Sequence, residues 1–217
     1  MNGQMLEILS SGVWETLYMT VVSTLLAYLF GIPIGVVLYI TDKKGICSNR
    51  IVNFIVGVIV NVIRSVPFLI LLVAILPFTR FIVGTTIGST ATIVPLVIAA
   101  TPFVARMVES SLKEIDPGVI EAAKAMGSSS VQIICKVLLP EAKPSLLVGG
   151  TISLATILSY SAMAGFVGGG GLGAIAINYG YYRYQAEIMW ITVALLVVIV
   201  QLFQEIGLRF VSKMDKR

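Results

Sequence analysis

A polar stretch interrupts an otherwise apolar chain. Residues 109–144 have the sequence ESSLKEIDPGVIEAAKAMGSSSVQIICKVLLPEAKP, and long apolar runs lie before and after them. The stretch carries acidic and basic side chains along its length, whereas the flanking runs are almost uncharged. Uncharged apolar runs of about 20 residues are long enough to cross a bilayer as helices. The stretch is therefore expected to lie on one side of a membrane and to connect two spans.

Helix caps divide the stretch into two short helices. Asp116 can accept hydrogen bonds from the free N–H groups of a first helical turn, and Pro117 fits the first helical position. Gly127 follows this helix, at a place where the chain often needs a positive φ. Residues 128–130 are serines that can cap a second helix, which is predicted to run through residues 136–139 and to stop near Pro140. The pattern predicts a helical hairpin.

The first of these helices has one apolar face. At 100° per residue, that face collects Val119, Ala122, Ala123 and Met126, with Ile120 at its edge and with Glu121 and Lys124 opposite. A short surface helix with an apolar face usually docks on another surface. The alternative is a solvated hairpin that only joins two spans.

The spacing of three blocks resembles the EAA loop of bacterial ABC importer permeases. The blocks are Glu121-Ala122-Ala123, Gly127 and Val137-Leu138-Leu139-Pro140. The family pattern is E-A-A, three residues, G, nine residues and I-x-L-P, and Val137 replaces its Ile. The resemblance implies that the loop is a coupling helix in a groove of a separate ATP-hydrolysing subunit. It assigns this coupling to Glu121, Ala122, Ala123, Met126, Gly127, Leu139 and Pro140.

Other blocks extend the resemblance over most of the chain. They are GVWETL (12–17), IRSVPF (63–68), PFTRFIVGT (77–85), PFVARMVE (102–109) and SYSAMAG (159–165). Together they are similar to the small methionine-importer permeases, which implies that methionine is the cargo. Another small amino acid or a related solute stays the alternative cargo, because no residue in the sequence identifies the cargo by its own chemistry.

The composition is that of a polytopic membrane protein. The 217 residues are 57% hydrophobic and 12% charged, with a mean hydropathy of +0.97, which is far from the usage of ordinary soluble domains. The net charge of +4 is attributed to Lys and Arg on the cytoplasmic side, and nucleic acid is not expected as a partner. The chain has no His, which removes His-based catalysis and most transition-metal sites. No catalytic or metal-binding residue is predicted.

The fold expected is all-α, with five transmembrane helices in one domain. The predicted spans are residues 16–40, 52–78, 83–105, 145–166 and 187–206, with a cytoplasmic coupling loop at 106–144. Five glycines among residues 168–173 exclude a further span there, because such a run does not hold a spanning helix and only 174–182 follow. We expect this run to form tight turns at the outer surface.

Basic residues predict the orientation. With the N-terminus outside, the inside segments are 42–50, 106–143 and the tail from Glu205, which hold three, five and four basic residues. These are twelve of the fifteen in the chain. Because Lys and Arg favour cytoplasmic loops, the prediction is N-out and C-in, in a bacterial cytoplasmic membrane.

Two groups of residues are candidates for the translocation pathway. Arg64, Ser65 and Pro67 lie in the second span, where Arg64 is the one ionisable residue well inside a span. The alternative for Arg64 is that it snorkels or pairs with carbonyls freed by Pro67. Tyr160, Ser161 and Met163 lie toward the outer end of the fourth span. Their alternative is ordinary helix packing by small and hydroxyl residues.

No phosphate-binding motif is present. The glycine run at 168–173 has no nearby Lys or Arg, and the chain contains no G-x-x-x-x-G-K-[ST]. No cofactor is therefore expected on this chain, and ATP and Mg²⁺ are expected on a partner ATPase.

The expected function is that of a transport subunit without enzymatic activity of its own. The expected partners are two cytoplasmic ATP-binding subunits, a second copy in a two-fold homodimer, an external solute-binding protein or lipoprotein, and membrane lipid. A secondary transporter is the alternative, but such proteins usually have internal repeats and mid-membrane ionisable residues. An intramembrane protease is not expected, because the chain has no His for a serine protease and no paired intramembrane carboxylates for an aspartyl protease. A structural membrane protein would tolerate changes at Glu121 and Gly127.

Overall fold

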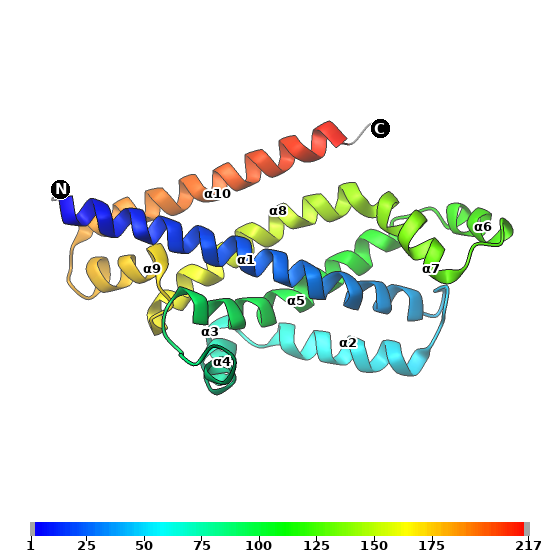
Figure 1. Cartoon of the computed structure of the whole chain (residues 1–217), viewed down its shortest axis with the longest axis horizontal. Helices are drawn as coiled ribbons and strands as arrows, with labels where there is room; N and C mark the ends of the chain where they lie inside the picture. The colour runs from blue at the N-terminus through cyan, green and yellow to red at the C-terminus, as the bar shows by residue number, and fades with distance from the viewer. Residues whose placement is uncertain (1–2, 215–217) are drawn as a thin grey trace.

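A computed structural model describes residues 3–214, with side chains described up to Arg209. All the regular structure in this part of the chain is helical (Figure 1). The long helices are α1 (Gly3–Thr41), α2 (Arg50–Ser65), α5 (Ser89–Lys113), α8 (Leu139–Ala164) and α10 (Ala186–Met214). The short ones are α3 (Phe68–Ala74), α4 (Leu76–Val83), α6 (Pro117–Ala125), α7 (Ser130–Ile133) and α9 (Gly171–Ile175).

Four helical stretches of the described chain are long and apolar enough to cross a membrane, and a bent pair of helices counted as one span makes a fifth. The four are Gly3–Thr41, Ser89–Lys113, Ser130–Tyr181 and Ala186–Arg209, and the bent pair is α2 with α3. The predicted all-α polytopic fold is confirmed, and the N-out, C-in orientation stays a prediction.

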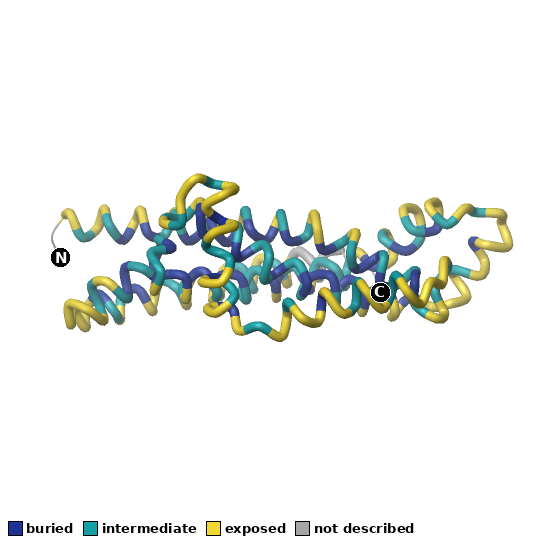
Figure 2. The backbone as a smooth tube through the Cα atoms, turned by 90° about the horizontal axis from the view of Figure 1, so that it is seen from below, coloured by how far each residue is buried: buried dark blue, intermediate teal, exposed yellow. Residues whose placement is uncertain are grey.

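Close packing of α1 on α5 forms the centre of the bundle. Gly31 and Gly35 of α1 are four residues apart, and both are buried. A Cβ on Gly31 would lie 2.6 Å from Val104 Cγ1, and one on Gly35 would lie 2.5 Å from the carbonyl oxygen of Ala105. Small residues at this spacing let two membrane helices approach closely. Buried residues consequently run along the middle of the bundle, while exposed ones lie on its outside and at its ends (Figure 2).

The second predicted span, 52–78, is not one helix. The axes of α2 and α3 differ by 103°, and the break lies at Val66 and Pro67. Val66 has φ −83° and ψ 126°, which is extended backbone. The side chain of a proline disfavours helical conformation in the residue before it, so the helix ends there. Residues 76–83, which were predicted as the end of the second span, a connection and the start of the third span, form the separate helix α4.

The other predicted boundaries shift by several residues. Helix α1 begins at Gly3 and runs unbroken through Pro33, and α5 begins at Ser89 and extends to Lys113. Residues 106–113 of the predicted coupling loop therefore belong to α5, and residues 139–144 belong to α8. These boundaries depend on packing against neighbours, which local sequence does not show.

The glycine run forms turns, as expected. Gly168, Gly170 and Gly171 have φ of 80°, 82° and 69°, which side chains rarely adopt. The chain then folds back as α9 and a π-helical segment, Ala176–Tyr181. The first N–H groups of α9 are capped from α1, because Gly171 N donates to Glu15 Oε2 at 2.6 Å and Leu172 N donates to Thr16 Oγ1 at 2.9 Å.

The predicted cytoplasmic loops lie at the same end of the bundle. The connection between α1 and α2 and the hairpin of α6 and α7 are at one end in Figure 1, and the N-terminus and α9 are at the other. This arrangement agrees with the distribution of basic residues, since two of the three predicted inside segments share one end.

Candidate coupling hairpin and translocation pathway

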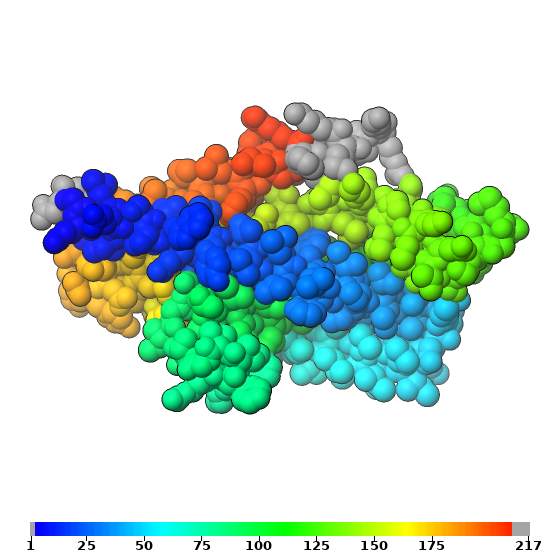
Figure 3. Space-filling view, in the orientation of Figure 1, coloured from blue at the N-terminus to red at the C-terminus, as the bar shows by residue number. Residues whose placement is uncertain are grey.

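The caps predicted for the hairpin are present. Asp116 is the N-cap of α6, and its Oδ1 accepts the N–H of Gly118 at 2.7 Å. Gly127 has φ 78°. Ser129 caps α7 in a capping box with Gln132, in which each side chain accepts the backbone N–H of the other residue. These local bonds fix the hairpin that projects at one end of the molecule (Figure 3).

The apolar face predicted for α6 is divided between the interior and the surface. Ala123 is buried in one cluster with Ile115, Ile133 and Leu138, and Ile120 packs against that cluster. The remaining members point outward, with Val119 at 41% and Met126 at 79% exposure, and Ala122 is also exposed. Burial therefore divides the predicted face, because its inner edge packs on α7 and on the segment after it while its outer edge stays exposed.

The exposed part of the hairpin has no cover within the described chain. Glu121, Ala122, Met126 and Gly127 are all exposed, and Val131 of α7 adds a further apolar side chain at 68% exposure. An apolar tip on a short hairpin outside the bundle is a surface suited to docking.

The second helix of the hairpin does not stop near Pro140, so that prediction is wrong. Helix α7 passes into a π-helical segment, Ile134–Leu138, which continues directly into α8. Leu139 N–H bonds to Ile134 O, five residues back, and Pro140, which has no N–H to donate, lies directly after this segment in the first turn of α8. Leu139 is partly buried against the main core, and Pro140 is exposed. The hairpin is thus joined rigidly to α8.

The pathway candidates of α2 lie at its bend. Arg64 and Ser65 end α2, and all of Arg64, Ser65 and Pro67 are exposed. Ser65 donates to Asn61 O within its own helix at 2.8 Å. Arg64 makes no hydrogen bond or ion pair to another described residue, so the bend is held by the Val66–Pro67 backbone and not by an Arg64 contact.

The pathway candidates of α8 have different surroundings. Tyr160 is partly buried and stacks on Phe68, the first residue of α3. Met163 is 47% exposed. Ser161 is buried and donates to Leu158 O at 2.8 Å, which satisfies its hydroxyl inside the subunit. The structure therefore brings the bend of α2 close to Tyr160 but leaves Ser161 facing the protein interior.

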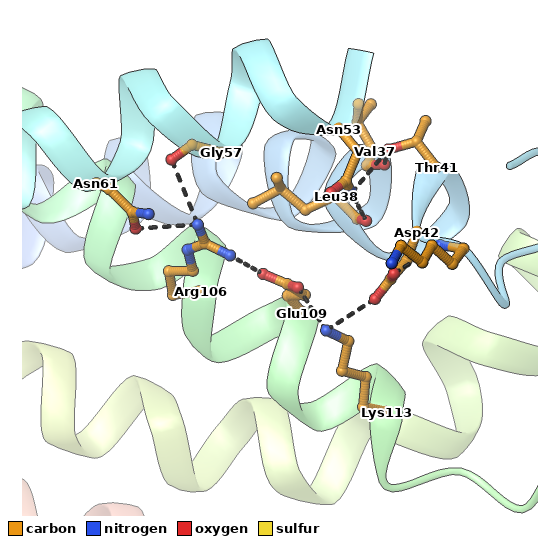
Figure 4. Close-up of polar contacts among 11 residues, drawn as sticks. Val37, Leu38, Thr41, Asp42, Asn53, Gly57, Asn61, Arg106, Glu109 and Lys113 are labelled. Atoms are coloured by element: carbon orange, nitrogen blue, oxygen red, sulfur yellow. Dashed lines mark hydrogen bonds and ion pairs between the residues drawn. The ribbon is translucent and has the colours of Figure 1, made fainter. Parts of the chain in front are cut away.

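A cluster of charged residues on and beside α5, which is not among the predicted site residues, ties three helices together (Figure 4). Glu109 is only 7% exposed. Its Oε2 accepts Arg106 Nη1 and its Oε1 accepts Lys113 Nζ, both at 2.7 Å. Lys113 also pairs with Asp42 at 3.1 Å. The signal in the sequence was the i,i+3 and i,i+4 spacing of opposite charges in R-x-x-E-x-x-x-K.

The same cluster reaches α2 through Arg106. Arg106 Nη2 donates to Gly57 O at 3.3 Å and to Asn61 Oδ1 at 2.9 Å. On the solvent side, the hydrogen bond from Lys113 and the backbone N–H of Lys43 lower the pKa of Asp42 from its ordinary value. Asp42 therefore stays ionised at neutral pH, and its contribution to stability is lost as the pH falls through that lowered value.

Comparison with known proteins identifies the family. Residues 31–214 match the model of the family described as the binding-protein-dependent transport system inner membrane component. A relative in Vibrio cholerae, named probable D-methionine transport system permease protein MetI, is 53% identical over 97% of this chain and 94% of its own. The protein of that name in Pasteurella multocida is 46% identical over the whole of both chains.

Solved structures agree with this assignment. A chain from inward-facing conformations of the MetNI methionine ABC transporter is 50% identical to this one, covers all of both chains and superposes with a TM-score of 0.98. A chain of an amino acid ABC transporter crystallised with histidines has the same fold, with a TM-score of 0.81 at 22% identity. The family match and these full-length likenesses lead to one conclusion: the chain belongs to the family of binding-protein-dependent transport system inner membrane components.

Proposed function

We propose that this chain is the membrane-spanning permease subunit of an ATP-driven importer and that its cargo is methionine. The observation that carries the proposal is the full-length likeness to a chain of the MetNI methionine ABC transporter, at 50% identity and a TM-score of 0.98. Relatives named as permeases of D-methionine transport systems support the same cargo. Both enantiomers are candidates, since the relatives' names specify D-methionine and the name of the solved transporter specifies neither.

The motor in this proposal is a separate pair of ATPase subunits. Membership of the family and the absence of a Walker motif from the sequence support that division of labour. ATP and Mg²⁺ would then bind to the partner, and this chain would have no enzymatic role. The surface proposed to meet the motor is the exposed part of the hairpin, with Glu121, Ala122, Met126 and Gly127.

Coupling in this proposal is mechanical. Ala123 is buried in one cluster with Leu112 of the end of α5, and Leu139 and Pro140 join the hairpin to α8. A displacement of the hairpin by the closing ATPase subunits is therefore passed to two long helices as rigid-body motion. Two copies of the chain, related by a two-fold axis, would open in turn to the cytoplasm and to an external solute-binding protein that delivers the cargo.

Co-purification with the motor tests the proposal. The tagged permease is isolated from native membranes in mild detergent, and the preparation is assayed for ATP hydrolysis and for co-purifying chains. After reconstitution together with the solute-binding protein, it is assayed for uptake of radiolabelled D- and L-methionine. We expect an ATPase subunit in equal ratio and ATP-dependent uptake of methionine. A single species without ATPase activity, under conditions that keep such complexes intact, would contradict the proposal.

A matched pair of variants directs the test to the hairpin. Met126→Asp places a charge on the 79%-exposed apolar tip, and Met126→Leu keeps an apolar side chain there. We expect Met126→Asp to insert normally but to lose the ATPase subunit on purification, and Met126→Leu to keep it. Equal retention of the subunit by both variants would remove the hairpin tip from the proposed interface.

A further inference from the structure

Helix α2 is weakly packed against the rest of the subunit. Of its sixteen residues, Val60 alone is buried. Large apolar side chains along the helix are exposed instead: Ile51, Phe54, Ile55, Val58, Ile59 and Val62. Apolar contact within this subunit therefore does little to fix the position of α2.

Polar contacts hold α2 at three successive places. Asn53 Nδ2 donates to Leu38 O of α1 at 2.7 Å. One and two turns further along, Gly57 O and Asn61 Oδ1 accept from the guanidinium of Arg106 on α5. Between membrane helices, where burial of apolar surface gives little driving force, such hydrogen bonds hold the helices together beside van der Waals packing.

Glu109 sets the position of Arg106. Glu109 is 7% exposed as a residue and lies on α5 among Val104, Ala105, Val108 and Leu112, all fully buried. Its two oxygens accept from Arg106 and Lys113, one each, so both cations are held on one face of α5. The two cations are balanced by Glu109 and Asp42, which leaves the cluster neutral. A buried carboxylate that loses one cation is strongly disfavoured, so the cluster keeps a single arrangement.

The same end of α5 carries the coupling hairpin. Three residues separate Lys113 from Pro117, the first residue of α6. One of them, Ile115, is buried in a common cluster with Leu112 and with Ala123 of α6. The hairpin, the end of α5 and the Arg106 contact to α2 are thus parts of one continuous set of contacts.

We propose that Glu109 is a positioning residue for transport: it holds Arg106 against α2, so that α2 and its bend move together with the hairpin. This inference rests on the proposed function, because the movement it transmits is the one imposed by the ATPase subunits. It adds a specific element to that function, an ionic clasp of Arg106, Glu109, Lys113 and Asp42 that links the motor contact to the bent arm α2–α3.

Replacing Glu109 with glutamine tests the clasp. An amide offers one acceptor and one donor group where the carboxylate offers two acceptors, so one of the two bonds to Arg106 and Lys113 must be lost. The whole complex of permease, ATPase subunits and solute-binding protein is reconstituted in liposomes, and ATP hydrolysis and methionine uptake are measured in the same preparation. We expect Glu109→Gln to keep its ATPase activity but to lose about tenfold in methionine taken up per ATP hydrolysed, the size of a typical coupling between sites.

The matched control is Glu205→Gln on α10. Glu205 forms an i,i+4 ion pair with Arg209, and both side chains are more than half exposed. Exposed pairs of this kind contribute little, so the uptake per ATP should equal that of the wild type. Hydrogen exchange gives a second readout: amides of residues 50–65 should exchange several-fold faster in Glu109→Gln than in Glu205→Gln.

A second variant covers the case in which Glu109→Gln fails to assemble. Asn61→Leu removes the shorter of the two bonds from Arg106 to α2 and leaves Glu109 paired with both cations, and we expect it to lower uptake per ATP in the same direction. If the methionine taken up per ATP hydrolysed is unchanged in whichever of these variants assembles, the clasp is overturned. This holds even if uptake and hydrolysis fall together, because a proportional fall indicates a residue that only stabilises the fold. Absence of ATP-dependent uptake by the wild type would instead overturn the proposed function.

Discussion

The rings of Phe68 and Tyr160 lie face to face, with centroids 4.5 Å apart and planes within 4° of parallel. Phe68 is the first residue of α3, directly after the bend at Pro67, and Tyr160 lies near the end of α8. The stack therefore joins the short helix beyond the bend to the helix that the hairpin enters. Aromatic pairs contribute about 1 kcal/mol beyond the area they bury.

We predict that this pair is coupled in stability. Tyr160→Leu and Phe68→Leu each keep an apolar side chain but remove one ring, so the double variant should be less destabilised than the sum of the two single variants by about 1 kcal/mol. Thermal inactivation of the purified complex provides the measurement. Tyr160→Phe keeps the stack and serves as the control. Strict additivity in the cycle would show that the stacked geometry contributes nothing of its own.

Gly127→Asp should block transport without preventing insertion. A Cβ at Gly127 would meet nothing within 4 Å, so the substitution is tolerated sterically and costs only the strain of φ 78°, about 1–2 kcal/mol. The added carboxylate would lie beside the exposed hairpin tip, where we propose that the ATPase subunit docks. The measurements are membrane insertion, co-purification of the ATPase subunit and methionine uptake. Gly127→Asn has the same size and backbone tolerance without the charge, and normal uptake by Gly127→Asp would contradict the docking surface.

Glu15→Ala should loosen α9. Glu15 Oε2 accepts the N–H of Gly171, the first residue of that helix, at 2.6 Å. A partly buried N–H left without its acceptor costs about 1–3 kcal/mol, so the apparent Tm of the purified protein should fall, with Glu15→Gln between alanine and wild type. Glu7→Ala removes an exposed glutamate from α1, the helix that also carries Glu15. This control should leave the Tm unchanged. Equal effects of Glu15→Ala and Glu7→Ala would argue against the cap.

Arg64→Leu should insert normally and transport poorly. The arginine is exposed next to the bend and has no polar partner among the described residues, so its removal leaves no buried group unpaired. In the wild-type protein, the guanidinium of Arg64 is available to a second copy of the chain, to lipid phosphate or to cargo. Uptake in reconstituted liposomes is the measurement, and Arg64→Lys is the control for a cation that only snorkels. Full transport by Arg64→Leu would remove Arg64 from the pathway.

The sequence by itself determined the features that depend on composition and on local backbone chemistry. Apolar runs gave the polytopic helical fold, because only helices satisfy backbone groups within a single segment in lipid. Asp116, Gly127 and Ser129 predicted the caps and the turn of the hairpin, since each acts on backbone atoms within three residues of itself. Pro67 accounts for the position of the bend, because it disfavours helical backbone at Val66, but the predicted span 52–78 did not include a break of 103°.

Contacts between distant parts of the chain were decided by the tertiary structure alone. Glu15 caps a helix 156 residues away, and Arg106 reaches α2 across 45 residues, and neither partner leaves a local pattern. The division of the α6 face has the same origin, because 100° periodicity groups Ala123 with Met126 and only packing on α7 and the segment after it buries one and leaves the other exposed. Local backbone preferences act within a few residues and are written in the sequence, whereas burial and ion pairing depend on which helices meet, and that is fixed only when the whole bundle has packed.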